Sequence, residues 1–244
     1  MQLLFAFIIL STITIIAVLL MILSKNTRSG KVHEIANQHN WQYQEFIDLN
    51  DTLKAANFGL LNYSQNVVFR HIISAEFLNN KDKSQDLSFF DCRAIEPLGI
   101  HNSSVIVSCL NFQTEYQGLH ACFTPILSSQ SASKDSMRSP IDNNYLIRLR
   151  HMQKLSLLTP HYAFEKHQLH ASKPNLLEKF LQQHIDNTDQ KSSLSTWLLA
   201  HPHLHIEISN GMLLAYQPNR LLDEESIIPA INAVIEISKY LSNK

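Results

Sequence analysis

Histidine is the residue type best suited to chemistry in this chain of 244 residues, which contains 13 histidines. The densest group is His201, His203 and His205, followed by Glu207, and these residues alternate with aliphatic ones. On a β-strand, residues i, i+2 and i+4 project from one face about 6–7 Å apart, which would align His203, His205 and Glu207. A His-x-His strand pair can hold zinc when a third ligand comes from elsewhere. His203 and His205 are therefore the candidate metal ligands.

Three interpretations of these histidines stay open. His167 and His170, three residues apart, could complete a zinc site and support a metal-assisted hydrolase. Alternatively, the histidines form the solvated face of an amphipathic strand whose aliphatic residues point inward, which is the interpretation we favour. The third is pH sensing, since unperturbed imidazoles titrate near pH 6.5.

The cysteines are the second group of possible reactive residues. Cys92, Cys109 and Cys122 are odd in number and lack the spacing of a disulfide framework, as expected for thiols in a reducing compartment. Each falls in a strand-like run, where a cysteine usually behaves as a small buried hydrophobe. A Cys–His pair with His101 or His120 stays open. Without a complete catalytic motif, an enzyme is the less favoured class, and no cofactor is expected.

Composition excludes other classes. The chain has 20 Lys and Arg against 21 Asp and Glu, so no excess of cations is available for nucleic acid. With 45% hydrophobic residues, the chain can bury a core and is not disordered. Only 5 glycines are present, and none forms a phosphate-binding loop.

The N-terminus predicts a membrane anchor. The first 24 residues carry no charged side chain, and residues 3–23 are almost continuously apolar. Twenty-one helical residues span about 30 Å, the thickness of a bilayer's hydrocarbon core. Lys25, Arg28 and Lys31 follow at once, and the positive-inside rule then places the rest of the chain in the cytoplasm. We expect an uncleaved, single-pass inner-membrane protein with a cytoplasmic C-terminal domain.

The remaining residues predict an α+β fold, in which one N-terminal transmembrane helix precedes a soluble domain with an antiparallel sheet and packing helices. Residues 25–127 read as a helix followed by a strand-rich half, and residues 128–144 as a polar linker or loop. Residues 145–244 form a mixed half. Its clearest elements are a helix over 174–185, a hairpin over 203–217 centred on Asn210-Gly211, and a C-terminal helix over 226–243. A further strand is expected over 145–150.

The order of these features resembles a group of single-pass, membrane-anchored proteobacterial proteins of unknown function. The resemblance is carried by the aromatic pair Trp41 and Tyr43, Phe58-Gly59, the segment 66–70, Phe90-Asp91 and the hairpin 206–216. It implies one anchor and an α+β domain, and it carries no catalytic residue. We expect a binding or interaction module near the inner membrane. One expected partner is the bilayer, which residues 3–23 would contact, and the other is a protein that the sequence does not identify. Nucleic acid is not expected as a partner.

Overall fold

The computed structural model describes residues 12–15, 27–47, 53, 56–62, 66–78, 83–96, 99–110, 116, 118–126, 152–155, 166–185 and 194–242. Most of the apolar segment 3–23, all of segment 128–144 and the strand expected over 145–150 lie outside these residues. Within the apolar segment, residues 12–15 are helical, and Ile13 and Ile15 are exposed. None of the helices in the described ranges is long and apolar enough to cross a membrane.

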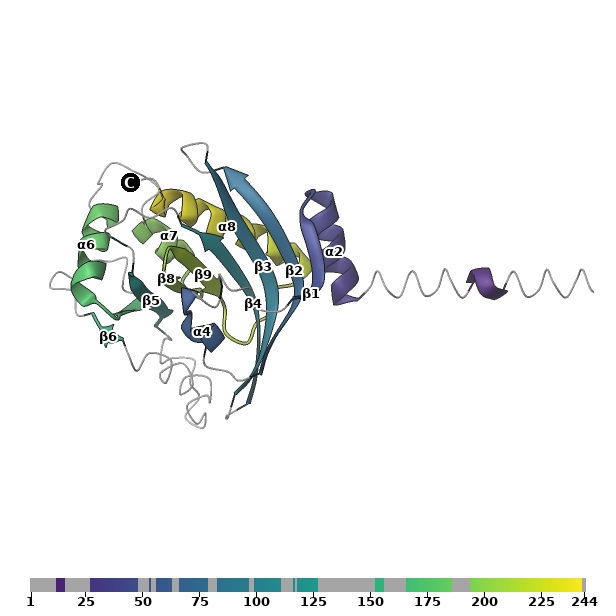
Figure 1. The fold of residues 1–244 in the computed structure, drawn as a ribbon, viewed down its shortest axis with the longest axis horizontal. Helices are drawn as coiled ribbons and strands as arrows, with labels where there is room; N and C mark the ends of the chain where they lie inside the picture. Colours follow the sequence, from purple (N-terminus) through teal and green to yellow (C-terminus); the bar gives the residue numbers. More distant parts are fainter. Residues whose placement is uncertain are drawn as a thin grey trace, which may run out of the picture.

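In the described part of the chain, nine strands form one sheet in which every neighbouring pair is antiparallel (Figure 1). In order across the sheet they are β1 (Gln42–Ile47), β2 (Asn66–Leu78), β3 (Ser84–Glu96), β4 (Gly99–Cys109), β9 (Met212–Tyr216), β8 (His205–Ser209), β5 (His120–Pro125), β7 (His167–Ala171) and β6 (Gln153–Lys154). The first four strands follow one another as a meander. Because β9 then pairs with β4, strands from both ends of the chain share one sheet.

The hairpin of β8 and β9 has a local cause. Asn210 and Gly211 connect the two strands with positive φ angles of 48° and 75°, which suit the two-residue turns that match strand twist. The turn is fastened to the end of β4, because the Leu110 N–H donates to the carbonyl of Gly211 at 2.6 Å. The hairpin therefore joins the meander at a fixed position.

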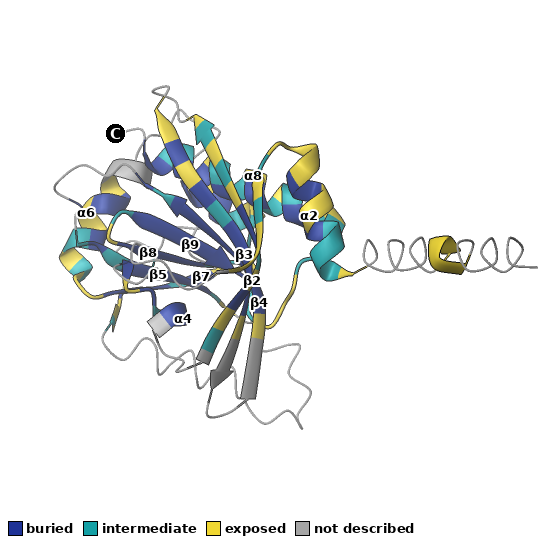
Figure 2. Ribbon diagram, turned by 45° about the vertical axis from the view of Figure 1, so that its right-hand side comes forward, coloured by how far each residue is buried: buried dark blue, intermediate teal, exposed yellow. Residues whose placement is uncertain are grey.

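Four of the described helices pack on one face of the sheet, which we call the helix face: α2 (Arg28–Gln38), α6 (Pro174–Ile185), α7 (Leu194–Ala200) and α8 (Glu224–Leu241). Side chains such as Val32 and Ile231 share a core with alternate strand residues such as Phe89 and Ile206. Figure 2 shows the resulting band of buried residues running through the strands. The Asp223 side chain caps α8 by accepting from the Ser226 N–H at 2.9 Å.

The opposite face carries much less cover. Among the described helices, only α4 (Gly59–Asn62) packs there, and we call residues 53 and 56–62 the strap and this side of the sheet the strap face. Phe58 and Leu60 of the strap form a second core with Phe90 and Leu214. The strap thus packs on the strands around Phe90 and Leu214.

Helix α2 is locked to the sheet at its first turn. Arg28 binds Asp91 of β3 with two hydrogen bonds, from Nε at 2.9 Å and from Nη2 at 3.0 Å. Ser104 of β4 donates to the same carboxylate at 2.6 Å, and the Arg28 guanidinium also donates to the Leu222 carbonyl. The Asp91 side chain is 9% exposed and that of Arg28 is 24% exposed. This bidentate pair fixes the start of α2 to β3, the third strand from the β1 edge of the sheet.

The predicted fold class, α+β with one N-terminal transmembrane helix, an antiparallel sheet and packing helices, is wrong. The protein is dominated by a single, mostly antiparallel sheet with few helices, and no described helix can span a membrane. In the second half, the described strands that the sequence did not predict are β6, which has only two residues, and β7, which is buried at four of its five positions and so lacks the alternation that marks a half-exposed strand.

Candidate functional site

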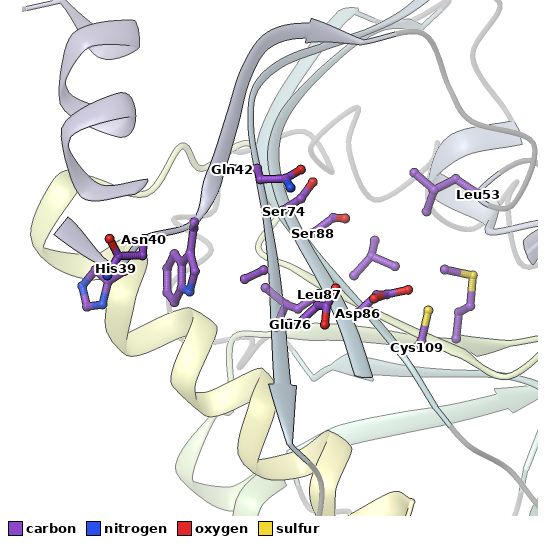
Figure 3. A pocket seen from close by; sticks show the side chains of 14 residues that line it. His39, Asn40, Gln42, Leu53, Ser74, Glu76, Asp86, Leu87, Ser88 and Cys109 are labelled. Atoms are coloured by element: carbon purple, nitrogen blue, oxygen red, sulfur yellow. The ribbon is translucent and has the colours of Figure 1, made fainter. Parts of the chain in front are cut away.

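A pocket of about 640 Å³ opens beside the strap, and we call it the edge pocket. Its lining comes from the corner between α2 and β1, from the strap, and from β2, β3, β4 and β9. The lining residues are His39, Asn40, Trp41, Gln42, Leu53, Ser74, Ala75, Glu76, Asp86, Leu87, Ser88, Val107, Cys109 and Met212. Figure 3 shows Gln42, Ser74 and Ser88 one after another, with Glu76 and Asp86 below them and Cys109 farther to the right.

The strand register builds the floor of the edge pocket. Gln42 of β1 lies opposite Ser74 of β2, Ser74 lies opposite Ser88 of β3, and Ser88 lies opposite Val107 of β4. Residues that are directly opposite in antiparallel strands project from the same face, so these four side chains form one row. The row offers a side-chain amide and two hydroxyl groups as hydrogen-bonding partners beside an apolar side chain.

Two carboxylates give the edge pocket its charge. Glu76 of β2 and Asp86 of β3 are directly opposite each other, and both are exposed. Like charges in this position destabilise a sheet. The Ser84 hydroxyl donates to Glu76 Oε2 at 2.8 Å, which satisfies one carboxylate oxygen. None of the 14 lining residues is Lys or Arg, so the pocket presents two negative charges without a cation of its own lining.

The thiol of Cys109 lies in the same lining as these carboxylates, and its surroundings favour the protonated form. Burial, and secondly the charge of Asp86, raises the pKa of Cys109. A thiol in such surroundings is a poor nucleophile, because reactivity belongs to the thiolate. The edge pocket is therefore suited to binding through charge and hydrogen bonds rather than to thiol chemistry.

The corner between α2 and β1 shapes the mouth of the pocket. Asn40 has a positive φ of 55°, and the Trp41 N–H donates to the Ala36 carbonyl at 2.8 Å, which ends the helix and turns the chain into β1. The rings of His39 and Trp41 stack with centroids 4.7 Å apart. β1 consequently begins only at Gln42, opposite Ser74, and β2 continues past this point.

The strap is held by a buried carboxylate on the far side of the pocket. Glu207 is 3% exposed, and its Oε1 accepts from the Gly59 N–H at 2.6 Å and lies 2.7 Å from His120 Nε2. Glu207 also lies opposite Cys122, which in turn lies opposite His170. The contact between Glu207 and His120 was not predicted from the sequence. Both residues lie at alternating positions of strands, and the register of β5 with β8 is what brings them together.

The candidate metal ligands do not gather at one point. His203 is exposed in the turn before β8, while His205 begins the strand and stacks on Tyr216 at 5.2 Å. His167 and His170 lie in β7 on opposite faces: the His167 imidazole contacts the Leu204 carbonyl on the helix face, and His170 lies opposite Cys122 on the strap face. Within the described ranges, no group of three or more His, Cys, Asp or Glu residues is arranged to hold a metal ion.

The remaining candidates from the sequence are the three cysteines and His170, and most of them are buried. Cys92 and Cys122 are buried, Cys109 is half-buried, and none of the three cysteines forms a disulfide. Burial, and secondly the charge of Lys154, lowers the pKa of His170, which favours the neutral imidazole. The acidic pair of the edge pocket was missed. The signal that could have found it is a carboxylate near each end of the polar turn that joins β2 to β3.

The chain matches no family model, no curated protein and no solved structure. Its resemblance to single-pass, membrane-anchored proteobacterial proteins stays a prediction.

Proposed function

We propose that this protein is a binding module that takes a protein partner in the edge pocket and that is kept at a membrane by its apolar residues 3–23. The observation that carries the proposal is the edge pocket itself, with two opposed carboxylates and no cation in its lining. A positively charged group from a partner would relieve the repulsion between Glu76 and Asp86.

The rigidity of the pocket supports binding rather than a conformational reaction cycle. The strap contributes Leu53 to the lining, and elsewhere in the strap Phe58 and Leu60 are essentially fully buried and the Gly59 N–H is bonded to Glu207. The floor is a continuous antiparallel sheet. A site that is formed in advance loses little conformational entropy when a partner binds.

Site-specific photo-crosslinking tests the proposal. A photoreactive amino acid replaces Ser88 in the floor of the pocket, or Gln182 on the exposed surface of α6 as a control, in the full-length chain in cells. We expect a discrete protein adduct from position 88 that is absent from position 182. The adduct should weaken when Glu76→Gln and Asp86→Asn are combined. The same adducts from both positions would refute a role for the pocket.

Membrane attachment has its own test. The sequence supports it through the uncharged residues 3–23 and the basic residues that follow them. Cell fractionation should recover the full chain with membranes and a chain lacking residues 2–24 in the supernatant. Reporters fused to the C-terminus should be active only on the cytoplasmic side. A chain that stays soluble in both forms would contradict attachment.

A further inference from the structure

Beyond Ser74, one side of β2 has no strand partner among the described residues, and this side, which we call the uncovered side, borders the edge pocket. β1 pairs with β2 from Phe69 to Ser74, so residues 75–78 pair, among the strands that the structure describes, with β3 alone. Alternate residues of an antiparallel strand direct their N–H and C=O groups to opposite sides. Two of these four residues therefore present both backbone groups to the uncovered side. Such an edge is a template for an added strand.

The two faces at this edge have different chemistry. On the strap face, Glu76 and Asp86 lie directly opposite each other at the end of the pocket (Figure 3). On the helix face, Ala75 and Phe77 are partly buried against the main core, together with Trp41 at the corner. A strand added beside β2 would place its alternate side chains against these two surfaces, because successive side chains point to opposite faces.

We infer that the edge pocket takes an extended protein segment that adds as a strand to residues 75–78 of β2, with a Lys or Arg side chain beside Glu76 and Asp86. The residues on either side of this cation are apolar and pack on Ala75 and Phe77. The inference rests on the proposed function and specifies the chemistry of the partner. Lys239 Nζ lies 6.0 Å from the centre of the Phe77 ring, so the apolar residue there packs beside the aliphatic stem of Lys239.

The two negative charges of Glu76 and Asp86 determine which kind of segment the edge accepts. The carboxylates repel each other across the β2–β3 pair, and an acidic segment would add a third negative charge to the same face. A basic side chain instead forms ion pairs with both groups. Backbone pairing supplies hydrogen bonds that are independent of the partner's sequence, and the charge and apolar positions supply selectivity.

The test uses two synthetic heptapeptides, one of alternating valine and lysine and one of alternating valine and glutamate. Each carries a fluorophore, and its binding to the full-length chain in neutral detergent is followed by anisotropy. We expect the lysine peptide to bind and the glutamate peptide to bind at least tenfold more weakly. Combining Glu76→Gln with Asp86→Asn should weaken the lysine peptide about threefold to tenfold. The matched control combines Glu34→Gln with Glu178→Gln, which removes two exposed carboxylates outside the pocket and should leave binding unchanged.

Backbone methylation separates strand addition from simple charge attraction. One lysine peptide is methylated on the backbone nitrogens of its valines and another on those of its lysines. Only one of these two sets can face β2, so one peptide should lose binding and the other should keep it. Equal affinities of the two methylated peptides would overturn the inference.

The two proposals fail in distinguishable ways. If the lysine peptide does not bind but position 88 still forms its specific adduct, strand addition is refuted and the binding module stands. If the adduct is absent while the lysine peptide binds with the expected dependence on Glu76 and Asp86, the edge accepts strands but the protein partner is refuted. Failure of both experiments refutes both proposals.

Discussion

The pair of Arg28 and Asp91 provides the sharpest test of how the domain is held together. In the variant Asp91→Asn, the side chain keeps one acceptor oxygen but loses its charge and its second acceptor. The guanidinium of Arg28 then faces an amide nitrogen at the place where it now makes a bond of 2.9 or 3.0 Å. Ser104, which donates to Asp91 at 2.6 Å, must compete for the remaining oxygen.

The expected cost follows from the exposure of the two partners. Breaking a fully buried ion pair by removing one partner costs about 3–5 kcal/mol, because the other charge stays buried without compensation. Asp91 is 9% exposed, but Arg28 is 24% exposed and also donates to the Leu222 carbonyl, which leaves part of its charge satisfied. We therefore expect Asp91→Asn to lower the free energy of unfolding by about 2–3 kcal/mol.

The same helix supplies a matched control. Lys31 of α2 forms an ion pair with Glu224 of α8 at 3.1 Å, and both side chains are about 40% exposed (41% and 39%). Exposed pairs contribute about 0–1 kcal/mol, so Glu224→Gln should cost less than 1 kcal/mol. The two variants remove one carboxylate each from contacts with α2 and differ mainly in burial.

Urea unfolding of the full-length chain, followed by far-ultraviolet circular dichroism, measures both variants. Urea carries no charge and does not screen the pairs. With a typical m value, Asp91→Asn should lower the midpoint by about 1 M and Glu224→Gln by much less. Added salt should reduce the effect of Glu224→Gln and leave that of Asp91→Asn nearly unchanged. Equal midpoints for the two variants would refute the conclusion that Arg28 and Asp91 form a buried clamp.

Three further predictions concern the strap, the hairpin turn and pH. Glu207→Leu removes the acceptor of the Gly59 N–H and of His120, so it should lower the free energy of unfolding by about 3 kcal/mol and accelerate hydrogen exchange at Gly59. Glu207→Gln keeps one oxygen as an acceptor, so it should lower the free energy of unfolding by about half as much. Equal losses of stability in the two variants would contradict the conclusion that the Glu207 carboxylate holds the strap. Gly211→Ala should lower the free energy of unfolding in urea by about 1 kcal/mol, because Gly211 has a φ of 75° and a new Cβ would lie 3.4 Å from the Leu110 carbonyl oxygen. An unchanged urea midpoint would contradict a turn that requires glycine. Burial lowers the pKa of His167 and His170 below 6.5, so below pH 6.5 the unfolded state binds more protons and the free energy of unfolding should fall as the pH is lowered towards 5. The pH slope should become shallower when His167→Gln and His170→Gln are combined, and an identical slope would locate the effect elsewhere.

Local patterns were sufficient for several elements. The apolar stripe over residues 174–185 predicts a helix, and α6 spans Pro174–Ile185. The Asn-Gly pair predicts a tight hairpin because both residues tolerate positive φ, and β8 and β9 meet there. In both cases the signal lies within a few residues, so no knowledge of distant contacts is needed.

Distant pairing was not predictable in the same way. The β9 strand lies between β4 and β8, and nothing in its uniformly apolar sequence specifies β4 as a neighbour. The spacing of His167 and His170 suggested a common site, but a strand sends residues three apart to opposite faces. The acidic pair likewise depends on register, because Glu76 and Asp86 become opposite only through the alignment of β2 with β3.

The clamp at Arg28 also determines where a partner must be presented. Helix α2 has 11 residues and is about 16 Å long, and it runs from this clamp to the corner at His39 where the edge pocket begins. Three residues separate position 23 from Thr27, the N-cap of α2, so the four steps from 23 to 27 reach at most about 14 Å. If residues 3–23 hold the domain at a membrane, the mouth of the pocket then lies within about 30 Å of the bilayer surface. Under that condition, the proposed basic segment would come from a protein in or near the membrane, and its basic character would also suit adhesion to anionic lipid.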